Sequence, residues 1–123
     1  MYGPERLIQD LQMLGYEAKL VAVNDNSKFA IILNYEIQLG QFAGRIIELG
    51  IPAPANFPIS AGSSIHVKAS PQLYEKQSIP NVRNVTDSVL GSEWLYWSKN
   101  FGWVGERTAR RLMSQINEVF KNA

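Results

Sequence analysis

Side chains that commonly perform chemistry are sparse in this chain, and the most reactive of them is a single histidine. His66 is the only histidine and there is no cysteine, which excludes disulfides, thiolate zinc sites and cysteine nucleophiles. A zinc site needs several ligands, so one histidine is weak support for a metal centre. A serine hydrolase would need His66 beside a serine and a carboxylate, and no G-x-S-x-G turn occurs. We therefore interpret His66 as an ordinary strand residue and expect no metal and no cofactor.

Basic and aromatic side chains are the other groups that could contact a partner. Arg107, Arg110 and Arg111 lie near the C-terminus, and we interpret them as a solvated helix face because the formal net charge is only +1. A nucleic-acid binder usually carries a strong basic excess, so the charge also argues against nucleic acid as a partner. The aromatic cluster at residues 94–103 is expected to be mostly core. No glycine-rich phosphate-binding loop precedes a helix.

The composition is that of one globular domain. The chain has 123 residues, of which 46% are hydrophobic, and this length is close to the commonest domain size. We therefore expect a single domain over residues 1–123. The first residues lack the basic start and apolar run of a secretory signal, and no apolar stretch is long enough to span a bilayer. The sequence thus predicts a cytoplasmic protein without a membrane partner.

The N-terminal part of the sequence predicts a helix followed by paired strands. Residues 4–14 carry apolar side chains at helical spacing, and Pro4 suits the first turn. Residues 16–23 and 28–38 predict two strands joined by a turn at 24–27. Large apolar side chains alternate in the second strand, so we expect all of them to face the helices. They are Phe29, Ile31, Leu33, Tyr35 and Ile37.

Two further strands are predicted in the middle of the chain. Residues 42–51 form an apolar run that predicts the third strand. Residues 51–62 contain three prolines and predict extended, irregular chain. The fourth strand is predicted at 63–69, with Ile65 and Val67 on one face.

The C-terminal part predicts a long loop and a closing helix. Residues 70–93 have little periodicity and are rich in Pro, Asn, Ser and Gly, which predicts a long loop. Residues 105–120 carry an apolar stripe at helical spacing. The predicted fold class is therefore α+β, with an N-terminal helix, a four-strand antiparallel meander, a long loop and a C-terminal helix.

Several short motifs, in their order along the chain, resemble the ubiquitin-conjugating-enzyme family. The proline passage at 54–58 is similar to the family's Tyr-Pro passage before its fourth strand. The run I-P-N-V at 79–82 resembles its His-Pro-Asn motif. Gly91, Trp94 and the pair at 97–98 resemble the residues that surround the family's catalytic cysteine.

A bacterial branch of this family is the most similar one. The run W-S-K-N-F-G-W at 97–103 resembles that branch, which is encoded beside ubiquitin-like, activating-enzyme and deubiquitinase-like proteins. The resemblance covers roughly residues 4–120 and implies the ubiquitin-conjugating-enzyme fold.

The residues that would perform the family's chemistry are absent. The motif histidine corresponds to Ile79, and the alternative histidine of the bacterial branch corresponds to Asn100. The catalytic cysteine is expected between Asn81 and Trp97, where none occurs, and a replaced cysteine would fall at a position in 82–92. A serine would replace it poorly, because a hydroxyl ionises far less readily than a thiol near neutral pH. The residues nearest to such a vestigial or altered site are Asn81, Ser88, Ser92 and Asn100.

The resemblance therefore implies a noncatalytic interaction module in a bacterial ubiquitin-like modification pathway. Its partner would be a ubiquitin-like protein, an activating-enzyme-like protein or an active conjugating subunit. Two alternatives stay open: an active conjugating enzyme whose cysteine has been replaced in this chain, and an unrelated small binding domain. The resemblance places the partner surface on segments 4–14, 52–58 and 94–100. The residues expected to contact the partner are Arg6, Pro54, Phe57, Trp94, Tyr96 and Lys99.

Overall fold

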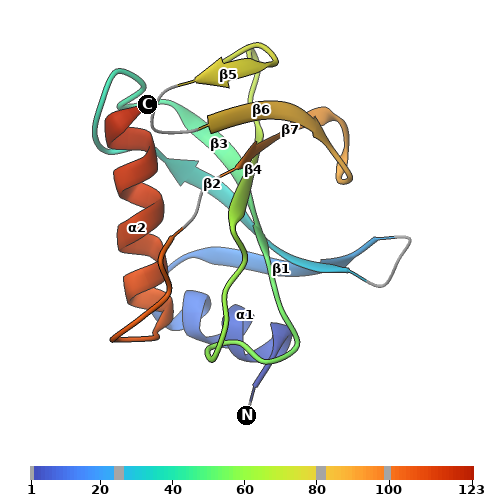
Figure 1. The fold of residues 1–123 in the computed structure, drawn as a ribbon, viewed down its shortest axis with the longest axis vertical. Helices are drawn as coiled ribbons and strands as arrows, with labels where there is room; N and C mark the ends of the chain where they lie inside the picture. Colours follow the sequence, from blue (N-terminus) through green and yellow to red (C-terminus); the bar gives the residue numbers. More distant parts are fainter. Residues whose placement is uncertain (1, 24–26, 80–82, 99–100) are drawn as a thin grey trace.

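A computed structural model of the chain describes residues 2–23, 27–79, 83–98 and 101–123 (Figure 1). Two helices and seven strands follow one another in these residues. They are α1 (Pro4–Met13), β1 (Glu17–Ala22), β2 (Lys28–Glu36), β3 (Ile46–Pro52), β4 (Ser64–Lys68), β5 (Gln77–Ile79), β6 (Arg83–Ser88), β7 (Gly91–Ser98) and α2 (Ala109–Asn122). This order confirms the α+β class with a helix near each end. Among the described residues, no helix is both long and apolar enough to span a membrane.

The described strands form one antiparallel sheet in the order β1-β2-β3-β4-β7-β6-β5. The first four strands pair in succession, as a meander does. The third begins later than predicted, at Ile46, because Gly40 and Gly44 adopt positive φ angles of 90° and 92° in the turns before it.

The prediction of a long loop at 70–93 was wrong. This segment contains β5, β6 and the start of β7, which extend the sheet beyond four strands. The pairing of this segment depends on a strand distant in sequence, because β7 pairs with β4 and β6 in turn pairs with β7. Val85 is buried while Asn84 and Thr86 beside it are exposed, so the alternation is too short to stand out in the sequence.

Both helices contribute to one hydrophobic core on the same face of the sheet. Leu7 and Leu11 of α1 and Ile116 of α2 belong to a cluster with the inward side chains of the strands. Ile65 and Val67 both belong to this cluster, which confirms that they share a face. Trp97 has no exposed surface, and its ring lies 5.4 Å from that of Phe120. Trp97 is therefore core as predicted, but Trp94 and Tyr96 are only half-buried, so the prediction that most of the aromatic cluster is core holds only in part.

A bulge in β2 changes which alternating positions face the helices. The register of β2 against β3 shifts between Ile32 and Tyr35, where Asn34 has a φ angle of 54°. Ala30 and Ile32 belong to the helix-side core before the bulge, and Tyr35 and Ile37 belong to it afterwards. An inserted residue shifts the two-residue period of a strand by one position, which explains the change.

The bulge makes the predicted burial of β2 wrong in part. Phe29 and Ile31 are buried, but on the opposite face, where the Phe29 ring lies 4.9 Å from the His66 ring. Leu33 is only partly buried. Tyr35 and Ile37 face the helices as predicted.

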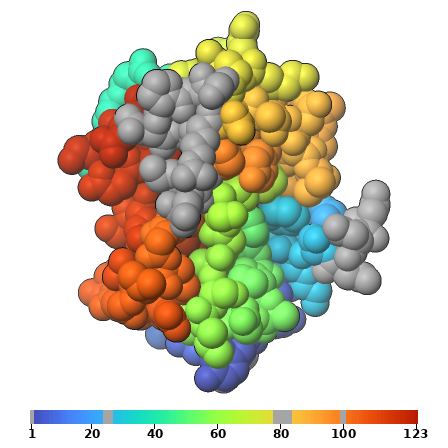
Figure 2. Space-filling view, in the orientation of Figure 1, coloured from blue at the N-terminus to red at the C-terminus, as the bar shows by residue number. Residues whose placement is uncertain are grey.

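The proline-rich passage between β3 and β4 packs against the segment before α2. The indole N–H of Trp103 donates to the carbonyl oxygen of Pro58 at 2.8 Å. The rings of Trp103 and Phe57 lie 6.4 Å apart. Figure 2 shows this neighbourhood, with the segment before α2 in orange beside the passage in green.

Candidate functional site

Strand β4 carries a row of polar side chains on the sheet face opposite the helices. Ser64, His66 and Lys68 alternate there with Ile65 and Val67, which point into the core. Ser64 and His66 are nevertheless only 5% and 4% exposed. Buried polar groups need hydrogen-bond partners, so the neighbours of this row define the candidate sites.

His66 is held by two serine hydroxyls. Its Nδ1 atom lies 2.7 Å from Ser88 Oγ, and its Nε2 atom lies 3.4 Å from Ser64 Oγ. Ser88 Oγ also accepts the backbone N–H of Leu90 at 3.0 Å. These contacts attach the turn between β6 and β7 to the middle of the sheet.

Apolar and aromatic groups surround the His66 ring. The Phe29 and Tyr96 rings meet it edge-on, with centroids 4.9 Å and 5.3 Å away. Leu90 lies over Gly50, where a Cβ atom would come within 2.8 Å of a Leu90 methyl group. Burial in these surroundings disfavours the imidazolium and lowers the pKa of His66 from 6.5 to about 4. His66 is therefore neutral at physiological pH.

The His66–Ser88 contact meets only one requirement of serine catalysis. A neutral imidazole beside a serine hydroxyl could act as a base towards it. A carboxylate that orients the imidazole is the further requirement, but the hydroxyl of Ser64 occupies the Nε2 side. Asp87, the residue before Ser88, is 84% exposed and pairs with Lys76 at 3.2 Å. We therefore interpret the His66–Ser88 contact as a structural clasp.

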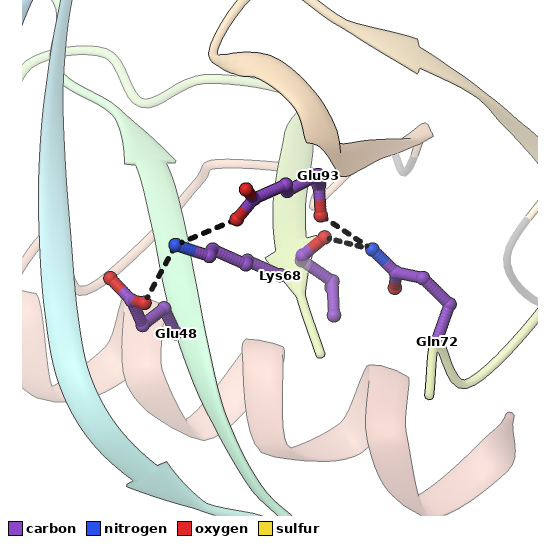
Figure 3. A network of polar contacts seen from close by, with 5 residues as sticks. Glu48, Lys68, Gln72 and Glu93 are labelled. Atoms are coloured by element: carbon purple, nitrogen blue, oxygen red, sulfur yellow. Dashed lines mark hydrogen bonds and ion pairs between the residues drawn. The ribbon is translucent and has the colours of Figure 1, made fainter. Parts of the chain in front are cut away.

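Lys68, at the end of the same row, is the centre of a polar network (Figure 3). Its Nζ atom lies 3.1 Å from a Glu93 carboxylate oxygen and 3.4 Å from one of Glu48. The Gln72 amide donates to the backbone carbonyl oxygens of Glu93 at 2.9 Å and Val67 at 3.1 Å. Hydrogen bonds to Glu93 and then Glu48 raise the pKa of Lys68 above its ordinary value. Lys68 therefore stays cationic and is unsuited to nucleophilic or Schiff-base chemistry.

The Lys68 network lines a hollow of about 740 Å³. This volume lies in the range of small-molecule sites, and two carboxylates against one ammonium favour a neutral polar or cationic ligand. No group of three or more histidine, aspartate and glutamate side chains suited to a metal occurs among the described residues. The lining residues are Asn34, Ile46, Ile47, Glu48, Lys68, Ala69, Ser70, Gln72, Ser92, Glu93 and Leu95.

The residues expected to contact a partner lie in different surroundings. Arg6 on α1 forms an ion pair with Asp10 at 2.8 Å. Pro54 is half-buried, and Trp94 and Tyr96 are half-buried on β7. The expectation for Phe57 is corrected, because its side chain is completely buried and packs in the core. Lys99 lies outside the described residues.

The structure describes two of the four residues expected near a vestigial catalytic site, Ser88 and Ser92. Ser88 ends β6 and bonds to His66, whereas Ser92 is exposed in β7 and lines the hollow beside Lys68. The two serines thus lie on either side of the hairpin turn and do not form one site. Asn81 and Asn100 lie outside the described residues.

Sequence reasoning missed both polar sites. The alternation of Ser64, His66 and Lys68 opposite Ile65 and Val67 was a usable signal, because it places three polar side chains on one face of a strand. Their partners come from distant strands and loops, and no local pattern indicates those contacts.

In the part of the chain that the structure describes, the fold and these sites define an α+β domain with a seven-stranded antiparallel sheet, a buried histidine clasp and a polar hollow. Comparison with known proteins found no matching family model, no matching curated protein and no matching solved structure.

Proposed function

We propose that this chain is a noncatalytic protein-interaction module, similar in fold to ubiquitin-conjugating enzymes, in a bacterial ubiquitin-like modification pathway. It would act in the cytoplasm on a ubiquitin-like protein, an activating-enzyme-like protein or an active conjugating subunit. The order of α1, the β1–β4 meander and the proline passage before β4 supports this proposal. The assignment to this pathway rests on the resemblance of the sequence motifs to the family.

The hydrogen bonds and exposure of the two serines in the 82–92 stretch support the proposal that the chain is noncatalytic. The chain has no thiol, and Ser88 Oγ is already bonded to His66 and to the backbone of Leu90. The other ring nitrogen of His66 meets the Ser64 hydroxyl and not the carboxylate that serine catalysis requires, and Ser88 Oγ already accepts the Leu90 N–H, so acyl transfer to Ser88 is not favoured. Ser92 is exposed, but the chain's only histidine is engaged by other hydroxyls.

The partly exposed aromatic residues of β7 are the best candidates for partner contact. Trp94 and Tyr96 lie on the sheet face that the helices leave uncovered, and Tyr96 covers one side of the His66 clasp. Tryptophan and tyrosine are enriched among the residues that dominate binding energy. Their positions in a paired strand fix their backbone, so little conformational entropy would be lost when a partner binds.

A titration of purified proteins tests the proposal. The ubiquitin-like protein and the activating enzyme encoded nearest to this gene are titrated against the parent chain and against Arg6→Ala, Trp94→Ala and Lys99→Ala. Each contact in the interface should weaken binding by about fivefold or more without lowering the melting temperature. Lys19→Ala, on the exposed part of β1, is the matched control and should bind as the parent does. If the parent binds neither protein at micromolar concentration, the proposal fails.

The alternative of a conjugating enzyme with a replaced cysteine has a separate test. Ser88→Cys and Ser92→Cys are each incubated with the activating enzyme, the ubiquitin-like protein and ATP. Ser92 is exposed on the edge of the hollow, which makes it the more accessible of the two positions. A reductant-sensitive adduct on either variant would favour the enzyme, whereas none is expected for a noncatalytic module.

The hollow beside Lys68 favours the second alternative, a small binding domain. Its excess of carboxylate over ammonium suits an organic cation. Titration with arginine amide or spermidine, followed by NMR shifts, would reveal such a ligand. Binding that is lost in Glu93→Gln would support this alternative, and unchanged spectra would remove it.

A further inference from the structure

Three hollows on the helical side of the molecule meet at Arg110. Their volumes are about 610, 180 and 270 Å³, and Arg110 lines all three. Together they follow the end of α1 and the first turns of α2, and we refer to them as the α1–α2 groove. The groove is lined by Asp10, Met13, Leu14, Tyr16, Glu106, Ala109, Arg110, Arg111, Met113, Ser114, Gln115 and Asn117.

The end of α1 gives the groove an exposed apolar edge. Met13 is 79% exposed and Leu14 is 44% exposed, and both line the hollow that also contains Ala109. Single exposed apolar residues are common, but two adjacent ones that border a groove form a surface suited to apolar contact. The flexible side chain of Met13 can also adapt to different partner surfaces.

The other edge of the groove is cationic. Arg110 and Arg111 line it, and Arg107 precedes the start of α2. The ion pairs among the described residues join none of these arginines to a carboxylate. The nearby acidic side chains are engaged, since Asp10 pairs with Arg6 at 2.8 Å and Glu106 accepts the hydroxyl of Thr108 at 3.1 Å.

Three arginines against one glutamate leave a local excess of two positive charges at the start of α2, when Asp10 and Arg6 are counted as neutral together. The helix dipole adds to this positive potential, because its N-terminal end lies at the same place. A complementary partner must therefore be negatively charged and carry an apolar stripe.

We propose that the α1–α2 groove binds an acidic amphipathic helix of a partner protein. The apolar stripe of that helix lies on Met13 and Leu14, and its flanking carboxylates reach Arg110 and Arg111. Helix-in-groove recognition joins an apolar stripe to charged flanks in this way. Met13 and Leu14 belong to segment 4–14, which the family resemblance also assigns to the partner surface, whereas Trp94 and Tyr96 lie on the opposite face of the sheet. The peptide experiments below use no ubiquitin-like protein or activating enzyme, so their failure would leave the proposed function untouched.

Two synthetic helical peptides provide the probes. Each has about 15 residues, a length at which helix formation in water is marginal but attainable, and carries leucines at helical spacing. One has glutamates at every other exposed position, and its counterpart has lysines there. We expect the acidic peptide to bind and the basic peptide to bind at least about tenfold more weakly. The dissociation constant of the acidic peptide should rise severalfold between about 50 mM and 300 mM salt.

Matched variants localise the binding. Arg110→Glu and Met13→Ser should each weaken acidic-peptide binding by about fivefold or more, and Arg110→Glu should improve binding of the basic peptide. Lys19→Glu makes the same change in net charge on an exposed residue of β1, and Val89→Ser removes an exposed apolar side chain on the β6–β7 turn. Both control variants should bind as the parent does, and all four should keep the parent's melting temperature.

Other outcomes would overturn the proposal. If Lys19→Glu weakens binding as much as Arg110→Glu, the attraction is a general charge effect. If neither peptide binds at millimolar concentration, the groove does not recognise this class of partner. If the parent forms a dimer in sedimentation experiments and Met13→Ser makes it monomeric, a second copy of the chain occupies the groove instead.

Discussion

The Nδ1 atom of His66 lies 2.7 Å from the hydroxyl oxygen of Ser88, and this contact joins β4 to β6 across β7, which lies between them in the sheet. Residues on such strands normally stand about two strand spacings, roughly 10 Å, apart. The contact is possible because the register of β6 against β7 shifts at Ser88 and the turn folds over the sheet face. Leu90 then packs over Gly50 and buries the imidazole.

The clasp predicts a loss of stability in mild acid. The pKa of His66 is about 4 in the folded chain and 6.5 in its ordinary state, so the unfolded chain binds more protons between these values. Protonation of His66 therefore favours the unfolded chain. The fold keeps this part of its stability above pH 6.5 and loses it as the pH falls towards 4. The free energy of unfolding should drop by about 2 kcal/mol between about pH 7 and pH 5, measured by urea denaturation.

A variant without an imidazole separates His66 from the carboxylates. His66→Gln is uncharged at every pH, so its free energy of unfolding should change much less between about pH 7 and pH 5. The slope with pH is compared, because the variant's absolute stability will also differ. Equal slopes for parent and variant would contradict the assignment of this pH dependence to His66.

Removal of the Ser88 hydroxyl should destabilise the β6–β7 turn. Ser88→Ala leaves both His66 Nδ1 and the backbone N–H of Leu90 without this partner. A buried polar group that loses its hydrogen bond costs about 1–3 kcal/mol. Ser92→Ala is the control, since Ser92 is exposed and its replacement should change stability by less than about 0.5 kcal/mol. Thermal and urea unfolding of both variants measure the difference. Similar losses of stability in the two variants would show that the Ser88 hydroxyl does not stabilise the turn as described.

Local patterns predicted the elements whose signals are contained within one segment. The two helices and the strands β1 and β4 follow from apolar spacing, as Ile65 and Val67 illustrate. Strands β5 to β7 were missed, because Val85 and Trp97 are the only buried side chains among those described in these strands, and because their pairing depends on β4. The His66–Ser88 contact was also missed, because 22 positions separate its members and a bulge brings them together.

The bulge in β2 predicts opposite outcomes for two neighbouring substitutions. Simple alternation predicts that Leu33→Asp buries a carboxylate, but Leu33 is only partly buried beside the bulge. Ile32 has no exposed surface and lies in the helix-side core. Ile32→Asp should therefore cost several kcal/mol or prevent folding, whereas Leu33→Asp should cost about 1 kcal/mol. The melting temperatures of the two variants test the register, and a larger loss for Leu33→Asp would contradict it.

The turn before β3 predicts a difference between two glycines with the same backbone conformation. Gly40 and Gly44 have φ angles of 90° and 92°, so alanine at either position pays a similar conformational penalty of about 1–2 kcal/mol. Their surroundings differ. A Cβ atom on Gly40 would lie 2.5 Å from the carbonyl oxygen of Phe120, whereas nothing lies within 4 Å of one on Gly44.

The clash at Gly40 is with backbone atoms in the last turn of α2, which cannot rotate away as a side chain can. Gly40→Ala should therefore displace the end of α2 and cost at least about 2 kcal/mol more than Gly44→Ala. The amide of Gln41 donates to the backbone carbonyl of Ala123 at 3.1 Å, so this contact would be disturbed as well. Urea denaturation gives the stability difference, and faster amide hydrogen exchange in the last turn of α2 would locate it. If the two variants are equally stable, Gly40 does not pack against the helix as described.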